Sequence, residues 1–165
     1  MAERNDRAAG AARHPTTARR QSDREVVVTR TFDAPARLVF EAWTRPELFR
    51  QWWVPKSIGL KLQSLEQDVR VGGGYRLVFD LGEGKSMAFF GKYLEVTPPS
   101  RLSWTNEESD VGAVTTVTFE EKDGKTHLTL SEAYPSKEAF DRNAGSADGL
   151  PEQFEQLDAL LASLG

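Results

Sequence analysis

The side chains that most often perform catalysis or bind metals are scarce in this chain. It has no cysteine and only two histidines among 165 residues, His14 and His127. Without cysteine there is no thiol nucleophile and no cysteine-based zinc or iron–sulfur site. His127 precedes Leu128 in an alternating strand pattern, so we expect it to face solvent. These residue types predict no metal site, no cofactor and no catalytic histidine.

Carboxylates are abundant and supply the remaining candidates for acid–base chemistry. Most lie at the ends of expected strands or in turns, as Glu107 and Glu108 do, and we interpret them as a solvated rim. Glu66 and Glu95 lie within expected strands and are the better candidates, although solvent exposure is the favoured interpretation for both. The glycines at 72–74 lack the spacing of a dinucleotide-binding fingerprint and indicate a turn. We therefore expect no enzymatic activity.

Aromatic residues, in contrast, are plentiful. The chain has nine Phe, four Trp and three Tyr, and all of them fall within residues 25–165. Two interpretations stay open: these rings fill a core, or some of them line an apolar pocket beneath a single helix that cannot cover a curved sheet. Arg30 alternates with Val28 and Phe32, so it faces inward in this pattern. A guanidinium in such surroundings needs a carboxylate partner or an anionic ligand.

The elements that must position these residues form an α+β arrangement. A β-branched run at 26–32 predicts a strand, and apolar residues at helical spacing predict two short helices after Pro35 and Pro46. Thr44 and Glu47 have the spacing of a capping box. Six further strands, separated by glycine and proline turns, are predicted at 58–69, 75–81, 87–96, 101–105, 114–121 and 126–133. A C-terminal helix from Pro151 carries one apolar stripe and is the only predicted element long enough to cover the sheet.

The first 24 residues differ from the rest. They contain six Arg and six Ala, no aromatic residue and a formal charge of +3. Such a segment buries too little apolar surface to order itself, so we predict a disordered basic extension at 1–24 and one domain at 25–165 with a charge of −7. The total of −4 argues against nucleic-acid binding, and no apolar run approaches the ~20 residues of a membrane span. We expect a cytoplasmic protein, monomeric or weakly dimeric.

Ordered blocks of the domain resemble a known family. Trp52-Trp53-Val54-Pro55 and Val71-Gly72-Gly73-Gly74-Tyr75 belong to these blocks. Together the blocks occupy 28–35, 38–47, 51–56, 70–76, 91–96, 98–102 and 117–121. They are similar to bacterial proteins related to the activator of the ninety-kilodalton heat-shock-protein ATPase (AHSA-type), within the SRPBCC superfamily of START lipid-transfer domains and the birch-pollen allergen.

The resemblance implies a helix-grip fold, with a curved antiparallel sheet of about six to seven strands, two short helices after the first strand and a long C-terminal helix over the concave face. It also implies a hydrophobic cavity that binds a hydrophobic or amphipathic small molecule. The alternatives are a chaperone-ATPase activator, whose partner is a chaperone, or an enzyme acting on a cavity-bound substrate. The candidate ligand-binding residues are Arg30, Trp43, Trp52, Trp53, Phe79, Phe89, Trp104, Phe119 and Phe154.

The chain departs from the family pattern at the start of the last helix. Gly149-Leu150 and Gln153-Phe154 stand where the family usually has glycine-methionine and glycine-tryptophan. Phe154 is expected to project toward the cavity in place of the tryptophan, which gives the mouth a different shape. The identity of a ligand does not carry over through these changes.

Overall fold

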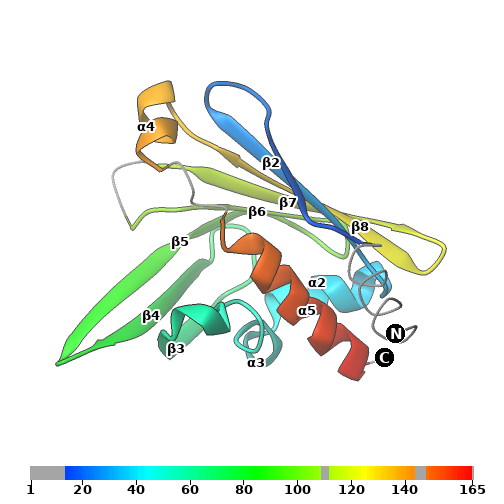
Figure 1. The fold of residues 1–165 in the computed structure, drawn as a ribbon, viewed down its shortest axis with the longest axis horizontal. Helices are drawn as coiled ribbons and strands as arrows, with labels where there is room; N and C mark the ends of the chain where they lie inside the picture. Colours follow the sequence, from blue (N-terminus) through cyan, green and yellow to red (C-terminus); the bar gives the residue numbers. More distant parts are fainter. Residues whose placement is uncertain (1–13, 109–111, 144–147, 165) are drawn as a thin grey trace, which may run out of the picture.

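An antiparallel sheet is the largest part of the fold. The computed structural model describes residues 14–108, 112–143 and 148–164. The strands are β1 (Thr17–Arg20), β2 (Glu25–Phe32), β3 (Lys61–Gln67), β4 (Gly74–Gly82), β5 (Lys85–Thr97), β6 (Arg101–Thr105), β7 (Val114–Lys122) and β8 (Lys125–Ala133). In this part of the chain, eight strands pair in the order β1-β2-β8-β7-β6-β5-β4-β3. Figure 1 shows that the sheet bends strongly, so that β3 and β4 lie at an angle to β2 and β8.

The bend occurs within β5. Its residues up to Lys92 pair with β4, whereas Tyr93 and the residues after it pair with β6. The register shifts between Tyr93 and Glu95, and a bulge of this kind increases the local twist. Gly91 lies beside this point, and a Cβ there would collide with the carbonyl oxygen of Thr105. The close approach of β5 to β6 therefore requires glycine at residue 91.

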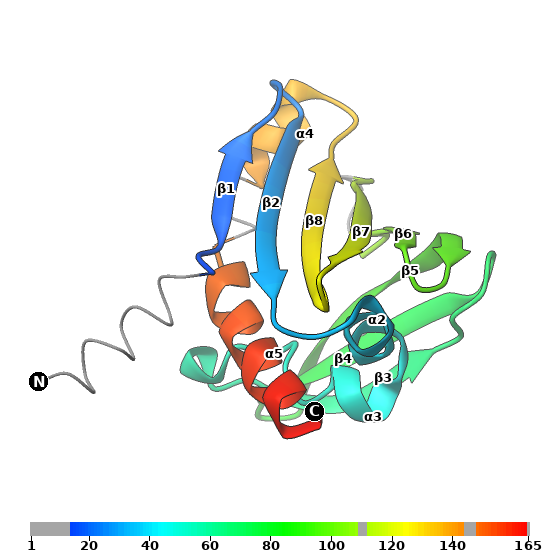
Figure 2. The same cartoon turned by 90° about the vertical axis from the view of Figure 1, so that its right-hand side faces the viewer.

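The described residues form four α-helices and one 3-10 helix. They are α2 (Ala36–Thr44), α3 (Pro46–Phe49), the 3-10 helix η1 (Lys56–Ile58), α4 (Lys137–Arg142) and α5 (Leu150–Leu164). Figure 2 shows α2, α3 and α5 together on one side of the sheet. The buried apolar residues of α5 recur at three- and four-residue spacing, from Leu150 through Leu157 to Leu161, and turn one face toward the core. None of the described helices is long and apolar enough to cross a membrane.

The core is dominated by aromatic rings from different elements. Trp43, at the end of α2, has Trp52 at 4.8 Å and Trp104 at 5.8 Å between ring centroids. Phe154 of α5 meets Phe32 of β2 edge to face at 5.5 Å. All three ring pairs have the inclined geometry that aromatic pairs prefer. Part of the aromatic surplus is therefore structural.

The N-terminal prediction needs correction. Thr17–Arg20 is not disordered but forms β1, which pairs with the edge of β2. All four residues of β1 are exposed, so the strand is held by backbone hydrogen bonds and requires no apolar side chains; composition alone therefore misses it. The Arg20 guanidinium also lies 4.4 Å from the ring centroid of Phe140. The predicted disorder at residues 1–13 lies outside the described residues.

Thr44 does not cap α3 in the way that the predicted capping box requires. Its hydroxyl donates to the Phe40 carbonyl oxygen at 3.0 Å, and Arg45 occupies the N-cap of α3 without a side-chain hydrogen bond. Thr44 is still the last residue of α2, so its side chain bonds back into the preceding turn. Pro46 in the first turn of α3 has no amide that needs a partner.

The predicted α+β class is confirmed, with its curved antiparallel sheet and long C-terminal helix. The strand count is eight in the described residues rather than six to seven, because β1 adds an edge strand. The predicted strand at 58–69 shortens to Lys61–Gln67, since η1 precedes it. The sequence pattern does not predict α4, whose first turn is capped by the Ser136 hydroxyl accepting from the Ala139 amide.

Candidate functional site

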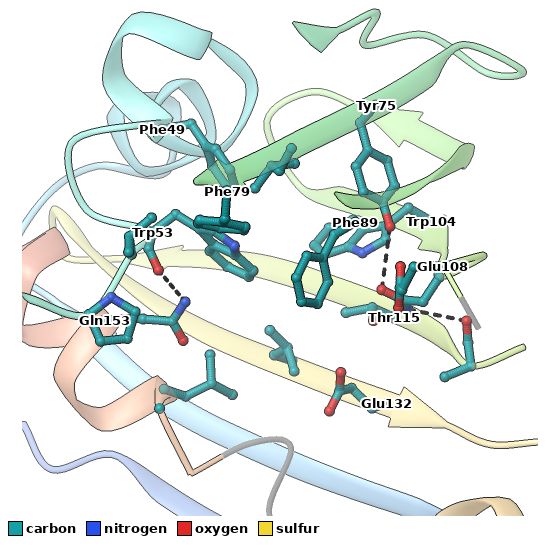
Figure 3. A pocket seen from close by; sticks show the side chains of 18 of the residues that line it. Phe49, Trp53, Tyr75, Phe79, Phe89, Trp104, Glu108, Thr115, Glu132 and Gln153 are labelled. Atoms are coloured by element: carbon teal, nitrogen blue, oxygen red, sulfur yellow. Dashed lines mark hydrogen bonds between the residues drawn. The ribbon is translucent and has the colours of Figure 1, made fainter. Parts of the chain in front are cut away.

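A cavity of about 510 Å³ lies between the inner face of the sheet, the start of α5 and the segment that follows α3. This volume is in the range of small-molecule sites. Figure 3 shows side chains from the strands and from α5 converging on it. Its apolar lining includes Trp43, Phe49, Trp53, Val54, Pro55, Ile58, Leu60, Leu77, Phe79, Met87, Phe89, Trp104, Ala113, Leu130 and Leu150. Its polar lining includes Gln67, Tyr75, Tyr93, Asn106, Glu108, Thr115, Glu132, Tyr134, Asn143 and Gln153.

The apolar walls come from both arms of the sheet and from α3. Phe79 of β4 and Phe89 of β5 meet edge to face at 5.6 Å. Phe49 stacks on Trp53 with ring centroids 4.9 Å apart. Among the lining residues, Ile58 and Phe89 are well exposed to solvent, so they mark the mouth of the cavity.

One end of the cavity is polar. The Tyr75 hydroxyl donates to the carbonyl oxygen of Thr105 at 2.7 Å, and the Asn106 amide donates to Thr115 Oγ1 at 2.9 Å. Thr115 of β7 stands opposite Glu132 of β8 in the sheet register. Figure 3 shows Glu132 and Thr115 on the side of the site away from Trp53 and Gln153. The cavity is therefore amphipathic.

Burial perturbs the phenols at the polar end. Desolvation raises the pKa of Tyr75 well above its ordinary value, and the negative charge of Glu108 raises it further. Desolvation also raises the pKa of Tyr93, although a hydrogen bond from Gln67 acts to lower it. Both phenols therefore stay protonated at neutral pH, because this environment disfavours an anion.

Two buried polar atoms on lining residues lack a partner. Gln67 donates through Nε2 to the Trp43 carbonyl oxygen and to Tyr93 Oη, both at 3.2 Å. Its Oε1 and the indole Nε1 of Trp43 have no hydrogen-bond partner among the described residues. Unsatisfied buried groups of this kind are uncommon and destabilising.

Polar side chains of α5 hold the wall formed by the segment after α3. Gln156 donates to the carbonyl oxygens of Trp52 and Val54 at 2.8 and 2.9 Å. Glu152 accepts from the amide and the hydroxyl of Ser57, and these hydrogen bonds lower the pKa of Glu152. Gln153 donates to the Trp53 carbonyl oxygen. This wall is therefore attached to α5 by side chain–backbone bonds that sequence periodicity does not reveal.

Five of the nine candidate residues line the cavity: Trp43, Trp53, Phe79, Phe89 and Trp104. The other four do not. Trp52, Phe119 and Phe154 are buried in the core instead. Trp52 donates through its indole nitrogen to the Ala42 carbonyl oxygen at 2.9 Å, and its ring meets that of Trp53 edge to face at 5.4 Å between centroids. Phe119 packs on Phe40 with ring centroids 5.4 Å apart.

Phe154 is a specific correction. It does not project into the cavity but packs among Phe32, Trp43 and Trp52. Leu150 and Gln153 are the α5 residues that line the cavity instead. The rotation of α5 about its axis decides this, because a change of one residue turns a helical side chain by about 100°.

Arg30 faces inward, as the alternation predicts, but it does not line the cavity. Its guanidinium forms an ion pair with Asp158 of α5 and lies 5.2 Å from the ring centroid of Phe32. Desolvation raises the pKa of Asp158, and the charge of Arg30 opposes this most strongly. The carboxylate partner, rather than an anionic ligand, accounts for this arginine.

The sequence does not reveal the polar end of the cavity. Its pattern predicts Glu108 in a solvated rim, yet Glu108 is half-buried and lines the cavity. The available signal is the alternation of Leu130 and Glu132 on one face of β8, continued by Tyr134 just after the strand, since all three line the cavity. Glu66 is exposed on β3.

Glu95 and His127 are the remaining titratable residues considered for chemistry. Glu95 accepts from Arg101 Nε at 2.8 Å, and His127 is exposed as predicted. The described residues contain no group of three or more His, Asp or Glu side chains placed to hold a metal ion.

Solved structures of bacterial proteins have the same fold. A protein from Rhodobacter sphaeroides has a TM-score of 0.82 and 25% sequence identity over 91% of this chain and 99% of its own. A protein from Chromobacterium violaceum has a TM-score of 0.71 and 27% identity over 84% and 97% of the two chains. A protein from Nitrosomonas europaea, at 22% identity, has a TM-score of 0.78 over 89% and 99%. No curated protein matches the chain significantly.

The family comparison covers most of the domain. Residues 33–162 match the family described as Activator of Hsp90 ATPase homolog 1-like protein. The matched residues run from the turn after β2 almost to the end of α5, so they include most of the cavity walls. This chain therefore belongs to the Activator of Hsp90 ATPase homolog 1-like family.

Proposed function

We propose that this protein binds a mostly apolar, amphipathic small molecule in the cavity beneath α5. The observation that carries the proposal is the cavity of about 510 Å³, whose lining is mostly apolar but includes polar side chains such as Tyr75, Thr115 and Gln153. A pure hydrocarbon would displace water from these polar groups without replacing its hydrogen bonds, at a cost in free energy. A molecule with a small polar group replaces those hydrogen bonds, while its apolar part gains from leaving water.

The architecture of the walls supports retention of such a molecule. One wall is the sheet, which the Gly91 bend curves around the cavity. The other is the segment that Gln153 and Gln156 attach to α5. Preformed walls reduce the ordering that binding must impose, which favours affinity. The exposed side chains of Ile58 and Phe89 provide an apolar entrance.

A ligand panel tests the proposal. We expect medium-chain alcohols and aromatic alcohols to raise the melting temperature and to change tryptophan fluorescence, because Trp43, Trp53 and Trp104 line the cavity. At a ligand concentration about 100-fold above Kd, the stabilisation is about 2.7 kcal/mol. The measurement is differential scanning fluorimetry with a fluorescence titration. If no member of the panel shifts either signal, the proposal is wrong.

Two exposed apolar residues of β5 offer a matched pair of variants. Phe89 lines the cavity and is 37% exposed, whereas Leu94 is 49% exposed and does not line it. We expect Phe89→Ser to weaken binding of the best panel ligand about tenfold, since an apolar contact of this size contributes roughly 1–3 kcal/mol. Leu94→Ser is expected to leave Kd unchanged. Equal Kd values for the two variants would contradict a cavity site.

A further inference from the structure

Gln153 of α5 places a neutral amide in the wall of the cavity, and the residue is only 8% exposed. Its side-chain nitrogen Nε2 donates to the Trp53 carbonyl oxygen. Because a carbonyl oxygen can only accept a hydrogen bond, this contact fixes which end of the amide faces Trp53. The side-chain oxygen Oε1 therefore points away from that carbonyl, as Figure 3 shows.

The Oε1 atom of Gln153 is an acceptor that has no donor within the described part of the chain. Among the described residues, the bond to Trp53 is the only hydrogen bond of the Gln153 side chain. Protein atoms do not enclose the oxygen either, since the enclosed polar atoms without a partner in the described ranges belong to Arg30, Trp43 and Gln67. A small molecule can therefore reach this oxygen.

Gly149 and Pro55 place the oxygen at a corner of the cavity. Both residues line the cavity together with Gln153. A Cβ added at Gly149 would lie 3.7 Å from Gln153 Oε1 and 3.6 Å from Pro55 Cγ. Because residue 149 has no side chain, the space beside the oxygen is left to an occupant of the cavity.

The acceptor is held in place before any ligand binds. The backbone amide of Gln153 donates to the Gly149 carbonyl oxygen at 3.0 Å in the first turn of α5. Gln156 donates to the carbonyl oxygens of both neighbours of Trp53, so the segment that orients the Gln153 side chain is itself fixed. A preorganised acceptor gains more from a correctly placed donor than a mobile one does, and it penalises a ligand that lacks the donor.

We propose that Gln153 selects ligands that carry a hydrogen-bond donor, either a hydroxyl or an N–H group, at one end of an apolar body. The donor binds Gln153 Oε1, and the apolar part lies against the aromatic walls of the cavity. This inference rests on the proposed function and adds the chemical class of the ligand. Ethers, esters and ionised carboxylates offer only acceptors, so they leave Oε1 without a partner.

Octanol and methyl heptyl ether test the class, because they are isomers with equal numbers of heavy atoms and only octanol has a donor. Each is titrated against the full chain at neutral pH, and displacement of the fluorophore N-phenylnaphthylamine reports Kd. We expect octanol to bind about three- to tenfold more tightly, which is the effect of one hydrogen bond. Equal Kd values, or tighter binding of the ether, would overturn the inference.

Variants of Gln153 locate the preference for a donor. Gln153→Leu removes the acceptor together with the bond to Trp53, whereas Gln153→Lys keeps a donor for Trp53 and offers no acceptor. Both variants are expected to bind the two isomers with Kd values within about twofold of each other. A preference for octanol that survives in the folded Gln153→Lys protein would overturn the inference.

Gln156→Leu is the matched control for the wall. Gln156 also attaches the segment after α3 to α5, but it does not line the cavity. This variant should keep the octanol preference of the unaltered chain. A preference lost equally in Gln156→Leu would overturn the inference, since the preference would then depend on the wall and not on the Gln153 acceptor.

The side-chain amide signals of Gln153 in an NMR spectrum provide a readout on the unaltered chain. A donor bound to Oε1 polarises the amide, so octanol should shift these proton and nitrogen signals. The ether, at the same occupancy, should shift them much less. Equal shifts with the two isomers would contradict a hydrogen bond to Gln153.

The octanol titration distinguishes failure of the ligand class from failure of the proposed function. Octanol binding without a preference over the ether contradicts the ligand class and leaves the proposed function standing. Failure of both isomers to displace the fluorophore or to shift the melting temperature contradicts the proposed function itself, and the inference with it.

Discussion

Replacement of Phe154 by alanine is expected to lower the free energy of unfolding by about 3–5 kcal/mol. Phe154 is fully buried, and its ring meets Phe32 at 5.5 Å and Trp43 and Trp52 at 6.5 Å between centroids. Its removal leaves a void where α5 packs on β2 and α2, and the surrounding rings are too rigid to fill it completely. Urea denaturation followed by far-UV circular dichroism measures the loss.

Leu164 is the matched control on the same helix. It is 41% exposed at the last turn of α5, so Leu164→Ala should change the free energy of unfolding by no more than about 0.5 kcal/mol. Because Phe154 does not line the cavity, the folded Phe154→Ala protein should retain its Kd for panel ligands. A loss below about 1 kcal/mol, or a weakened Kd with unchanged stability, would show that Phe154 faces the cavity after all.

Arg30→Ala has the second largest expected effect. Arg30 is 5% exposed and Asp158 is 35% exposed at the side chain. Removal of one partner from a fully buried pair costs about 3–5 kcal/mol, and the partial exposure of Asp158 reduces the expectation to about 2 kcal/mol at neutral pH. Binding of panel ligands should not change, since neither residue lines the cavity. Denaturation and ligand titration of the same preparation measure both quantities.

The loss in Arg30→Ala should depend on pH in a defined direction. Burial already raises the pKa of Asp158, and Arg30 is the strongest influence that lowers it, so the variant should raise this pKa further. A carboxyl whose folded pKa exceeds the unfolded value of about 3.9 favours folding at low pH and loses that contribution as the pH rises through the folded pKa. The destabilisation should therefore be larger at pH 7 than at pH 4.

An exposed ion pair provides the comparison for this prediction. Arg101 donates to Glu95 at 2.8 Å with both side chains well exposed, so Arg101→Ala should cost no more than about 1 kcal/mol. An NMR titration of the Asp158 carboxyl checks the direction of the pKa change. A lower pKa of Asp158 in Arg30→Ala, or an equal cost for the two arginine variants, would contradict the structural role of the pair.

The predicted strands and helices were largely correct because the signals for them are local. Val117 and Phe119 are buried and alternate with the more exposed Thr116 and Thr118, as expected for β7. The apolar stripe of α5 likewise follows from the helical period. β1 was missed because an exposed edge strand depends on backbone pairing with β2, a long-range contact that side-chain composition does not encode.

Which of two neighbouring aromatic residues lines the cavity could not be predicted from such local signals. Trp52 and Trp53 are adjacent, yet Trp52 is in the core with its indole bonded to Ala42, whereas Trp53 lines the cavity. In the turn after α3 adjacent side chains point in different directions, and tertiary packing decides which of them meets the cavity. For the same reason, Gln153 of α5 lines the cavity and its neighbour Phe154 does not.

The sequence by itself determined that this domain has no cysteine, few histidines and many aromatic residues. It also predicted a curved antiparallel sheet covered by a helix. It also determined that Arg30 faces inward. Only the tertiary structure decided that Asp158 neutralises Arg30, and that Glu108 and Glu132 meet at one end of the cavity. Glu108 lies in the loop after β6 and Glu132 lies on β8, so the pairing of β6 and β8 on either side of β7, rather than any local periodicity, brings the two carboxylates to one site.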